Sequence, residues 1–394
     1  MNSRSRVRTA MSPGQPDRVP VFCQLSIGHY FLNASSSPFD IWYRSEAFAD
    51  ALVELQRRYR FDGILVNLPG RDPEFERHID RIEEREGESV VRWKNRCFTR
   101  LPHDDNPHYF RPDGSRFFPS LGEIDPENLW YVEPWDITGI TCPYAWGFDA
   151  EPRPREDFFP PFHLNAIRAV IEKTGHEVSV HSEAFSPFSQ LLELLSYESA
   201  LLALVEDPGK VHACLDRLTE GAIDLASRQA ATGVDAVLVS SAFAGSGFIS
   251  REHYAEFVLP YERRLIAATR ALHPDVKLCT HTCGGIGDRL DLMLETGTDG
   301  IDALDPPPLG TVELEEAVPA LKGKAFLKGN IDPVNTLLLG SKGAVREAVQ
   351  HRLRVAAPGG GYILSTACSV PPRVRPELIE FLSEVAMEHG SYCP

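Results

Sequence analysis

The sequence has no long hydrophobic run, and this absence excludes one class of protein at the start. No stretch of its 394 residues approaches the roughly 18 consecutive apolar residues that a membrane-spanning helix needs. The range 1–17 is rich in arginine but lacks an apolar core, so we expect neither a signal peptide nor a membrane span there. Internal repeats and low-complexity tracts are also missing. The sequence therefore predicts a soluble globular protein.

Positive charge is scarce, and so are closely spaced cysteines. The chain has 40 Lys and Arg against 56 Asp and Glu, a net charge of −16, which argues against nucleic acid or an anionic membrane as a partner. The eight cysteines are scattered along the chain and do not form a disulfide framework. In a reducing cytoplasm they would stay thiols and could bind a metal. We therefore expect a cytoplasmic protein.

Short apolar and β-branched runs alternate with amphipathic stretches of helical length. The predicted strands are Val19–Leu25, Gly63–Asn67, Glu177–Phe185, Asp235–Ser241, Val276–His281, Gly300–Leu304, Ala325–Gly329 and Gly361–Ala367. The clearest predicted helices are Ser45–Tyr59, Pro208–Ala231 and Arg251–Leu272, with Asp207 and Ser250 as capping residues. Eight β/α units predict a (β/α)8 TIM barrel over residues 19–394, after an N-terminal extension of residues 1–18. A doubly wound sheet is the alternative, but no glycine-rich nucleotide turn follows the first strand.

The range 71–135 does not follow this alternation. Glu88–Trp93 is a strand candidate and Pro112-Asp113-Gly114 is a turn candidate, a pattern typical of hairpins. We therefore predict a hairpin-rich insertion after the second strand. Such insertions on barrels often form functional lids at the mouth, and plain decoration of the barrel is the alternative.

Three metal-binding side chains end two of the predicted strands. In His281-Thr282-Cys283, residues 281 and 283 point to the same face, because strand side chains alternate. Cys368 ends the last strand, and the C-terminal ends of barrel strands meet at one mouth. One imidazole and two thiolates favour zinc, and three protein ligands leave a fourth position open, as in catalytic zinc sites. We therefore predict a zinc enzyme.

Core packing is the alternative role for these residues, because a buried cysteine usually behaves as a small hydrophobic residue. Gly284 and Gly285 follow the motif and allow the chain to turn sharply, which favours the metal site. Cys279 shares the face of His281 but lies about 6.6 Å lower along the strand. We expect Cys279 to fill the barrel rather than to bind the metal.

Polar side chains at other strand ends are candidates for the chemistry. Asp302 and Asp305 follow the next strand, where either could be a fourth ligand or could orient His281. Capping of loop amides is the alternative for both. We predict Glu183 and Asp305 as catalytic residues, with Glu183 donating or accepting a proton. His181 shares the face of Glu183 and is a candidate for substrate binding.

Four further residues are predicted to bind the substrate. They are His29, Tyr30, Phe185 and Asn330. His29 and Tyr30 follow the first strand, and Asn330 ends the seventh. For Tyr30 and Phe185 the alternative is simple packing. Asp332 lies near Asn330 but precedes a proline, so it could merely start a helix.

From about Asp17 to its end, the chain resembles the uroporphyrinogen decarboxylase superfamily. The resemblance rests on Asp17-Arg18-Val19-Pro20-Val21, Glu206-Asp207-Pro208, Phe257-Val258-Leu259-Pro260-Tyr261, His281-Thr282-Cys283-Gly284, Gly329-Asn330-Ile331-Asp332-Pro333 and Cys368-Ser369-Val370-Pro371-Pro372. It implies a (β/α)8 barrel, in agreement with the strand count. A homodimer is also possible, since homodimers are common in that family and among soluble enzymes.

This superfamily has two well-known branches. Its decarboxylases carry an Arg-Gln-Ala-Gly-Arg segment after the first strand that grips the porphyrin carboxylates, whereas residues 24–30 here contain no arginine. The other branch contains zinc-dependent methyltransferases that work with corrinoid proteins, and their ligands form a His-x-Cys and a distant Cys. His281, Cys283 and Cys368 match that pattern. The resemblance therefore implies the methyltransferase branch, with Zn²⁺ as cofactor.

Membership of that branch implies methyl transfer between a small substrate or a thiol and a corrinoid (cobalamin) or tetrahydrofolate. No corrinoid-binding domain is visible in the sequence, so we expect a separate carrier protein. The aromatic pocket candidates, which favour a small methylated or methoxylated donor, are Phe22, Tyr30, Phe185, Phe188 and Phe243. Two other hypotheses stay open. One is a lyase that acts on a small carboxylic acid held by Arg373 or Arg375, and the other is a non-catalytic zinc-binding barrel.

Overall fold

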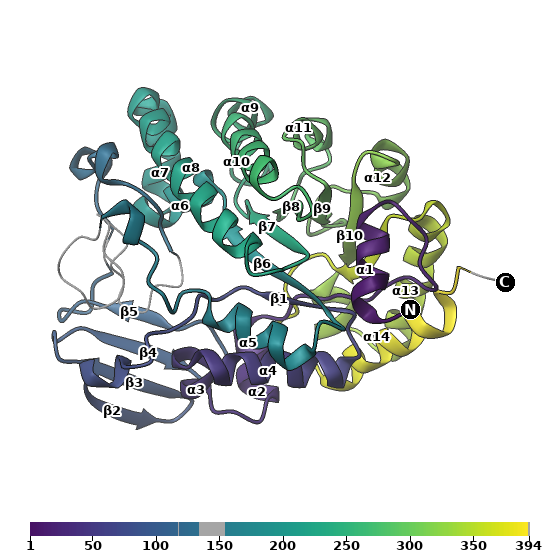
Figure 1. Cartoon of the computed structure of the whole chain (residues 1–394), viewed down its shortest axis with the longest axis horizontal. Coiled ribbons are helices and arrows are strands. Elements are labelled where there is room, and N and C mark those ends of the chain that lie inside the picture. The colour runs from purple at the N-terminus through teal and green to yellow at the C-terminus, as the bar shows by residue number, and fades with distance from the viewer. Residues whose placement is uncertain (117, 134–153, 393–394) are drawn as a thin grey trace.

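A curled parallel sheet forms the centre of the molecule in the computed structural model, which describes residues 1–116, 118–133 and 154–392 (Figure 1). Its strands, in spatial order, are β1 (Gly63–Val66), β6 (Ser179–Phe185), β7 (Ala236–Ser240), β8 (Lys277–Thr282), β9 (Gly300–Ala303), β10 (Phe326–Ile331) and β11 (Tyr362–Thr366). Every neighbouring pair is parallel. Seven of the eight predicted strands are therefore confirmed, and with them the barrel-type α/β fold.

The predicted first strand, Val19–Leu25, is wrong as a regular strand. It forms only isolated bridges, in which Val21 pairs with Leu364 and Leu25 pairs with Val370. Pro20 has no amide hydrogen to donate, and the amide of Val21 donates to the Asp62 carboxylate instead of to a neighbouring strand. A continuous ladder cannot form under these conditions. The segment nevertheless runs parallel to β11 and takes the place of the eighth strand.

Helices surround the sheet and cover its outer face (Figure 1). They are α1 (Ser3–Met11), α2 (Ile27–Asn33), α3 (Pro38–Tyr43), α4 (Ser45–Tyr59), α5 (Asn165–Thr174), α6 (Pro187–Leu195), α7 (Tyr197–Glu206), α8 (Pro208–Ala230), α9 (Arg251–Phe257), α10 (Leu259–Leu272), α11 (Leu290–Glu295), α12 (Leu314–Leu321), α13 (Lys342–Ala356) and α14 (Pro376–His389). Short 3₁₀ turns and one π-helical turn lie at Phe75–His78, Leu121–Glu123, Pro126–Asn128, Arg155–Asp157, Pro333–Leu338 and Ala357–Gly359. In the described part of the chain no single helix could span a membrane, although the bent pair α6 and α7 together meets the length and composition criteria.

The helix ends agree with the capping residues expected from the sequence, with one correction. The Asp207 carboxylate accepts a hydrogen bond from the amide of Lys210, and α8 begins at the next residue, Pro208. The predicted single helix Arg251–Leu272 is wrong, because the structure has α9 and α10 with a break at Val258. Pro260 lies in the first turn of α10, where its missing amide hydrogen ends the preceding helical ladder.

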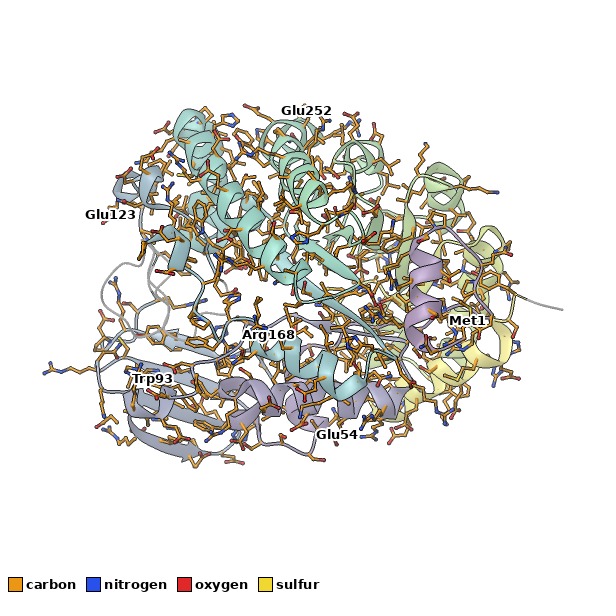
Figure 2. All side chains as sticks on the ribbon, viewed as in Figure 1. Met1, Glu54, Trp93, Glu123, Arg168 and Glu252 are labelled. Carbon is orange, nitrogen blue, oxygen red and sulfur yellow. The ribbon has the colours of Figure 1, made fainter. Side chains whose placement is uncertain are left out.

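An antiparallel sheet lies within the range 71–135. Its strands are β2 (Ile79–Arg85), β3 (Glu88–Trp93), β4 (Phe98–Pro102) and β5 (His108–Phe110). Trp93 anchors this sheet (Figure 2), since its indole donates to the Thr99 hydroxyl and its ring packs against Tyr43 of α3. The sheet is thus fixed to the helical layer beside the barrel. A role as a lid stays a prediction.

The N-terminal extension is folded and closes the bottom of the barrel. Val7, Ala10 and Met11 of α1 are buried in one apolar cluster with side chains from β1, β7, β8, β10 and β11. The amide of Arg4 donates to the carbonyl of Glu177 just before β6. The N-terminal strand ends are therefore covered, and the C-terminal ends are left to form the site.

A buried carboxyl on α10 is expected to make stability depend on pH. Glu262 is 0% exposed, and burial raises its pKa to about 7 from an ordinary value of 4.5. As pH rises above 4.5, the unfolded chain loses this proton while the folded chain keeps it, so stability falls until the pH passes about 7. Between pH 4.5 and about 7, the free energy of unfolding of the wild type should fall by roughly 3 kcal/mol more than that of Glu262→Gln. Urea unfolding at a series of pH values measures both. Glu256→Gln, at a half-exposed carboxylate, is the control; an unchanged slope in Glu262→Gln would contradict the prediction.

Candidate metal site

The structure brings the three predicted metal ligands together at the C-terminal mouth of the barrel. His281 lies near the end of β8, Cys283 follows that strand, and Cys368 follows β11. Nε2 of His281 is 3.2 Å from Sγ of Cys283, which is 3.6 Å from Sγ of Cys368. One donor atom from each residue lies within 4.8 Å of the others. Within the described ranges, no fourth His, Cys, Asp or Glu belongs to this cluster.

This donor set fits a zinc ion. With bonds of about 2.3 Å to sulfur, a tetrahedral zinc separates two thiolates by roughly 3.8 Å. The observed Sγ–Sγ distance of 3.6 Å is close to that value, so little rearrangement would be needed. The sulfurs of Cys283 and Cys368 are free thiols and so are available to a metal. Cys279 is buried lower in the barrel among apolar side chains, in agreement with its predicted packing role.

Asp302 holds the far side of the His281 imidazole. Its Oδ2 lies 3.6 Å from Nδ1 of His281 and 2.8 Å from Nζ of Lys328. At 3.6 Å this is an ion-pair distance rather than a hydrogen bond, and a carboxylate on that side favours a proton on Nδ1, which leaves the lone pair of Nε2 for a metal. Of the two roles predicted for Asp302, the contacts therefore support orientation of His281.

The electrostatics of the cluster favour a cation between the imidazole and the thiols. Burial lowers the pKa of His281, but the contacts with Asp302 and Cys368 outweigh it and raise the value to about 10. Hydrogen bonding from Cys283, followed by the nearby imidazole, holds the pKa of Cys368 well below its usual range. The Asp302 carboxylate and the thiol sulfurs thus favour positive charge at this position, which a metal cation would supply.

Asp305 fixes the loop that carries Cys283. Its Oδ2 accepts a hydrogen bond of 2.6 Å from the amide of Gly284. Burial raises the pKa of Asp305 to about 6. The chain reaches this position through Ala303 and Leu304, which have the left-handed φ values of 82° and 59°. The loop-capping alternative is thus what the contacts show, and a catalytic role for Asp305 stays a prediction.

Glu183 and His181 face the barrel interior from β6. Burial raises the pKa of Glu183 to about 7, and the hydroxyl of Ser240 and the charge of His281 only partly offset the effect. Burial also lowers the pKa of His181 to about 3, and its ring packs 4.7 Å from that of Phe22. A neutral imidazole and a carboxyl that titrates near neutral pH therefore lie side by side along the strand.

The predicted aromatic pocket is not one cluster. Phe22 lies in the lower core of the barrel, and Phe188 is buried in α6. Phe243 instead packs at the rim with Tyr197 and Phe248, with ring centroids 4.7 and 5.5 Å away. Phe185 is half-buried at the end of β6, where its amide donates to the hydroxyl of Tyr131. Among these rings, Phe185 lies on the same strand face as Glu183.

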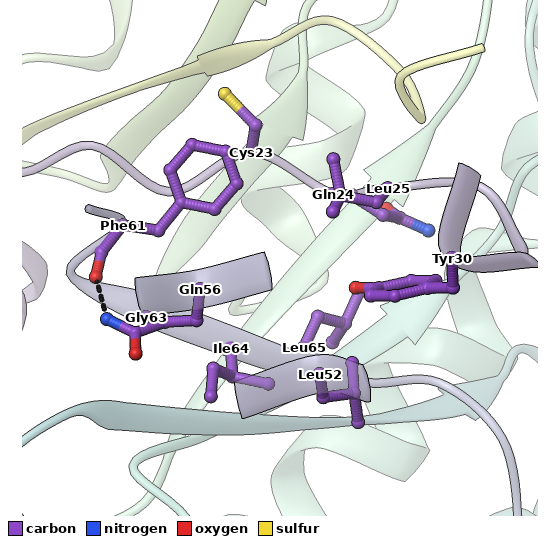
Figure 3. A pocket seen from close by; sticks show the side chains of 10 residues that line it. All are labelled: Cys23, Gln24, Leu25, Tyr30, Leu52, Gln56, Phe61, Gly63, Ile64 and Leu65. Atoms are coloured by element: carbon purple, nitrogen blue, oxygen red, sulfur yellow. Dashed lines mark hydrogen bonds between the residues drawn. The ribbon is translucent and has the colours of Figure 1, made fainter. Parts of the chain in front are cut away.

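His29 and Tyr30 lie on α2. A pocket between the segment Val19–Leu25, α4 and β1 lies beside this helix (Figure 3). The Tyr30 side chain reaches into this pocket toward Leu52 and Leu65. His29 is fully buried, and its Nε2 is hydrogen-bonded to the hydroxyl of Tyr59 at 2.7 Å. Tyr30 therefore lines a pocket, whereas the imidazole of His29 is hydrogen-bonded to Tyr59 in the protein interior.

Asn330 and Asp332 are held by neighbouring loops. The Asn330 amide donates to the carbonyl of Leu304, and its oxygen accepts from the guanidinium of Arg352. Asp332 accepts hydrogen bonds from the amides of the turn that follows it, the structural role considered for it from the sequence. Substrate binding by Asn330 stays a prediction.

Sequence reasoning missed two buried cations near the site. Lys328 is 3% exposed in the middle of β10, and a lysine inside the predicted strand Ala325–Gly329 was a visible signal. Arg289 is 0% exposed and donates to the carbonyls of Ala244 and Ile249. In the same loop, the carbonyl of Ala242 accepts a hydrogen bond from the amide of Cys283. Arg289 also pairs with the adjacent Asp288, but its carbonyl partners come from another loop, which no local pattern indicates.

Comparison with known sequences gives a family match over most of the barrel. Residues 150–389 match the sequence model described as uroporphyrinogen decarboxylase (URO-D). The chain is 31% identical over 189 residues to the uroporphyrinogen decarboxylase of Thioalkalivibrio sulfidiphilus, which covers 48% of this chain and 51% of that protein. It is 28% identical over 207 residues to the methylcobamide:CoM methyltransferase MtbA of Methanosarcina acetivorans, which covers 52% of this chain and 57% of that protein. The matched region thus spans roughly half the length of these relatives.

One solved structure matches over nearly the whole chain. A methyltransferase from Methanosarcina mazei superimposes with a TM-score of 0.70 over 98% of this chain and 99% of that chain. Sequence identity in this comparison is 17%. The likeness therefore shows a shared fold.

Proposed function

This chain belongs to the uroporphyrinogen decarboxylase family, and we propose that within it the protein is a zinc-dependent methyltransferase. It would move a methyl group between a small methylated or methoxylated substrate, or a thiol, and a corrinoid. The corrinoid would be carried by a separate protein, with tetrahydrofolate as the other possible carrier. One observation carries the proposal: one imidazole and two thiols converge at the mouth of the barrel.

Nε2 of His281 and the sulfurs of Cys283 and Cys368 would hold the zinc. Once bound, the metal would supply a positive charge that keeps thiols deprotonated and polarises the oxygen or sulfur that carries the methyl group. The Asp302 carboxylate, 3.6 Å from Nδ1 of His281, would favour a proton on that nitrogen and so leave Nε2 for the metal. Asp305 holds the Gly284 backbone and so fixes the direction in which Cys283 points.

Proton transfer is the role that we assign to Glu183. Methyl transfer to a thiol releases a proton, and methyl removal from an ether leaves an oxygen that takes one up. A half-buried carboxyl with a pKa of about 7 can hold or release that proton near neutral pH.

The segment after the first predicted strand offers no arginine for a decarboxylase substrate, and one of the two other candidates is already paired. Residues 24–30 contain no arginine, and a substrate with several carboxylates needs cationic partners. Arg373, one of two candidates, is largely exposed and forms an ion pair with Asp104. These contacts favour methyl transfer over decarboxylation.

The test is transfer of a methyl group to cobalt. Zinc-loaded protein is mixed with Co(I) cobalamin and a panel of small methyl ethers and methylated amines or thiols. In the expected reaction, Co(I) attacks the methyl carbon and a carbon–cobalt bond forms. The heteroatom that carried the methyl group keeps the electron pair of the broken bond and takes up a proton. We expect at least one donor to give the methylcobalamin spectrum with the loaded protein and none with the metal-free protein.

The reverse reaction, from methylcobalamin to a small thiol, is measured in parallel. Release of CO₂ from small carboxylic acids by a metal-free preparation, without methyl transfer in either direction, would contradict the proposal. That result would favour a lyase. Zinc binding without either reaction would favour a non-catalytic zinc-binding barrel.

A further inference from the structure

A buried lysine lies inside the barrel beside the candidate metal site. The side chain of Lys328 on β10 is 4% exposed, and its Nζ donates to Oδ2 of Asp302 at 2.8 Å. The same Nζ lies 4.6 Å from the ring centroid of Phe22. A buried ion pair is rarely more stable than apolar residues of similar volume. Stability alone therefore does not explain a lysine at this position.

The strand register places Lys328, Asp302 and His281 in one row. His281 of β8 pairs with Asp302 of β9, and Asp302 pairs with Lys328 of β10. Paired residues on adjacent parallel strands point to the same face at a spacing of about 4.8 Å. The carboxylate is thus between an ammonium on one side and the imidazole on the other. Its second oxygen accepts a hydrogen bond of 2.9 Å from the amide of Ala303.

We propose that Lys328 is a positioning residue for the metal site, which acts by holding the Asp302 carboxylate against Nδ1 of His281. Nε2 is then directed to the metal in a fixed orientation. The inference rests on the zinc site of the proposed function. It goes beyond that site, because it holds that Lys328 on β10 sets the orientation of the ligand His281 on β8, two strands away.

If Lys328 acted only by direct electrostatic repulsion of the metal, its removal would change zinc affinity in the opposite direction. Removal of a positive charge near a dication would strengthen zinc binding by Coulomb's law alone. Loss of a positioning residue would weaken it, because the imidazole is no longer held in place. Orienting partners of metal ligands typically change metal affinity by about 10- to 100-fold.

The experiment is a double-mutant cycle on zinc affinity, measured by competition with a chromophoric chelator. The proteins are the wild type, Lys328→Met, Asp302→Leu and the double variant, with Lys324→Met at an exposed lysine as control. We expect each single variant at the site to bind zinc about 10- to 100-fold more weakly. We expect the double variant to match Asp302→Leu, because Lys328 acts only through Asp302. The control should bind zinc like the wild type.

Cobalt(II) substitution supplies a readout that a merely structural role would not change. The thiolate-to-cobalt charge-transfer band should persist in Lys328→Met, while the ligand-field bands shift because the imidazole has moved. If Lys328→Met does not fold, Lys328→Gln keeps a neutral donor and should show a smaller loss of zinc affinity.

Three results would overturn the inference. They are unchanged or tighter zinc binding in the folded Lys328 variant, a further loss in the double variant beyond that of Asp302→Leu, and lower stability with an unchanged cobalt spectrum. Failure of the proposed function is a different result, since the wild type itself would then bind no zinc, or would bind zinc without transferring a methyl group.

Discussion

Replacement of Cys283 and Cys368 together by serine is expected to abolish zinc binding and, with it, methyl transfer. A serine hydroxyl stays protonated at neutral pH and is a poor ligand for zinc, whereas a thiol near a metal becomes a thiolate. With only His281 left, the site cannot retain the ion. We expect about one zinc per chain in the purified wild type and none in the double variant, measured by elemental analysis.

Cys97→Ser is the matched control, because Cys97 lies in the turn before β4 of the antiparallel sheet and is not part of the metal-ligand cluster. This variant should keep its zinc and its activity. Zinc retained by the Cys283→Ser/Cys368→Ser protein would show that the metal lies elsewhere. No zinc in either protein would refute the methyltransferase proposal and leave a metal-free lyase as the better hypothesis.

Replacement of Asp62 by alanine is expected to lower the free energy of unfolding by about 3–5 kcal/mol, the usual cost of breaking a buried ion pair. Asp62 is 0% exposed just before β1. Its carboxylate accepts hydrogen bonds from the guanidinium groups of Arg6 and Arg18 and from the amide of Val21. Loss of these contacts leaves two cations and a backbone amide without their shared partner. Urea unfolding followed by circular dichroism measures the effect.

The control for this prediction is Asp80→Ala, at an exposed ion pair with Arg81. Such pairs contribute at most about 1 kcal/mol, so the control should stay close to the wild type. A loss in Asp62→Ala no larger than in the control would show that the network does not stabilise the fold. The expected result would instead show that one carboxylate holds α1, the segment Val19–Leu25 and β1 together.

Much of the fold could be predicted because its signals are local. The seven regular barrel strands are short apolar runs, and α4 begins and ends at the residues predicted from its amphipathic pattern. The metal ligands were predictable for a similar reason. Strand alternation places His281 and Cys283 on one face, and Cys368 ends the last strand.

Other features depended on contacts between distant segments. Val19–Leu25 has the composition of a strand, but the Asp62 carboxylate takes the amide that a regular ladder would need. Asn330 looked available for a substrate, yet its amide bonds to Leu304 and Arg352. In each case a polar group found its partner far away in the sequence.

The sequence by itself determined most of the segments that form strands and helices and the residues that could bind a metal, because backbone propensity and side-chain alternation are set within a few residues. Only the tertiary structure decided which side chains meet. The register of β8, β9 and β10 places His281, Asp302 and Lys328 in one row, and burial sets the pKa of Glu183 near 7. Both depend on how strands distant in sequence pack, since hydrogen-bond partners and exclusion of water are properties of the folded chain.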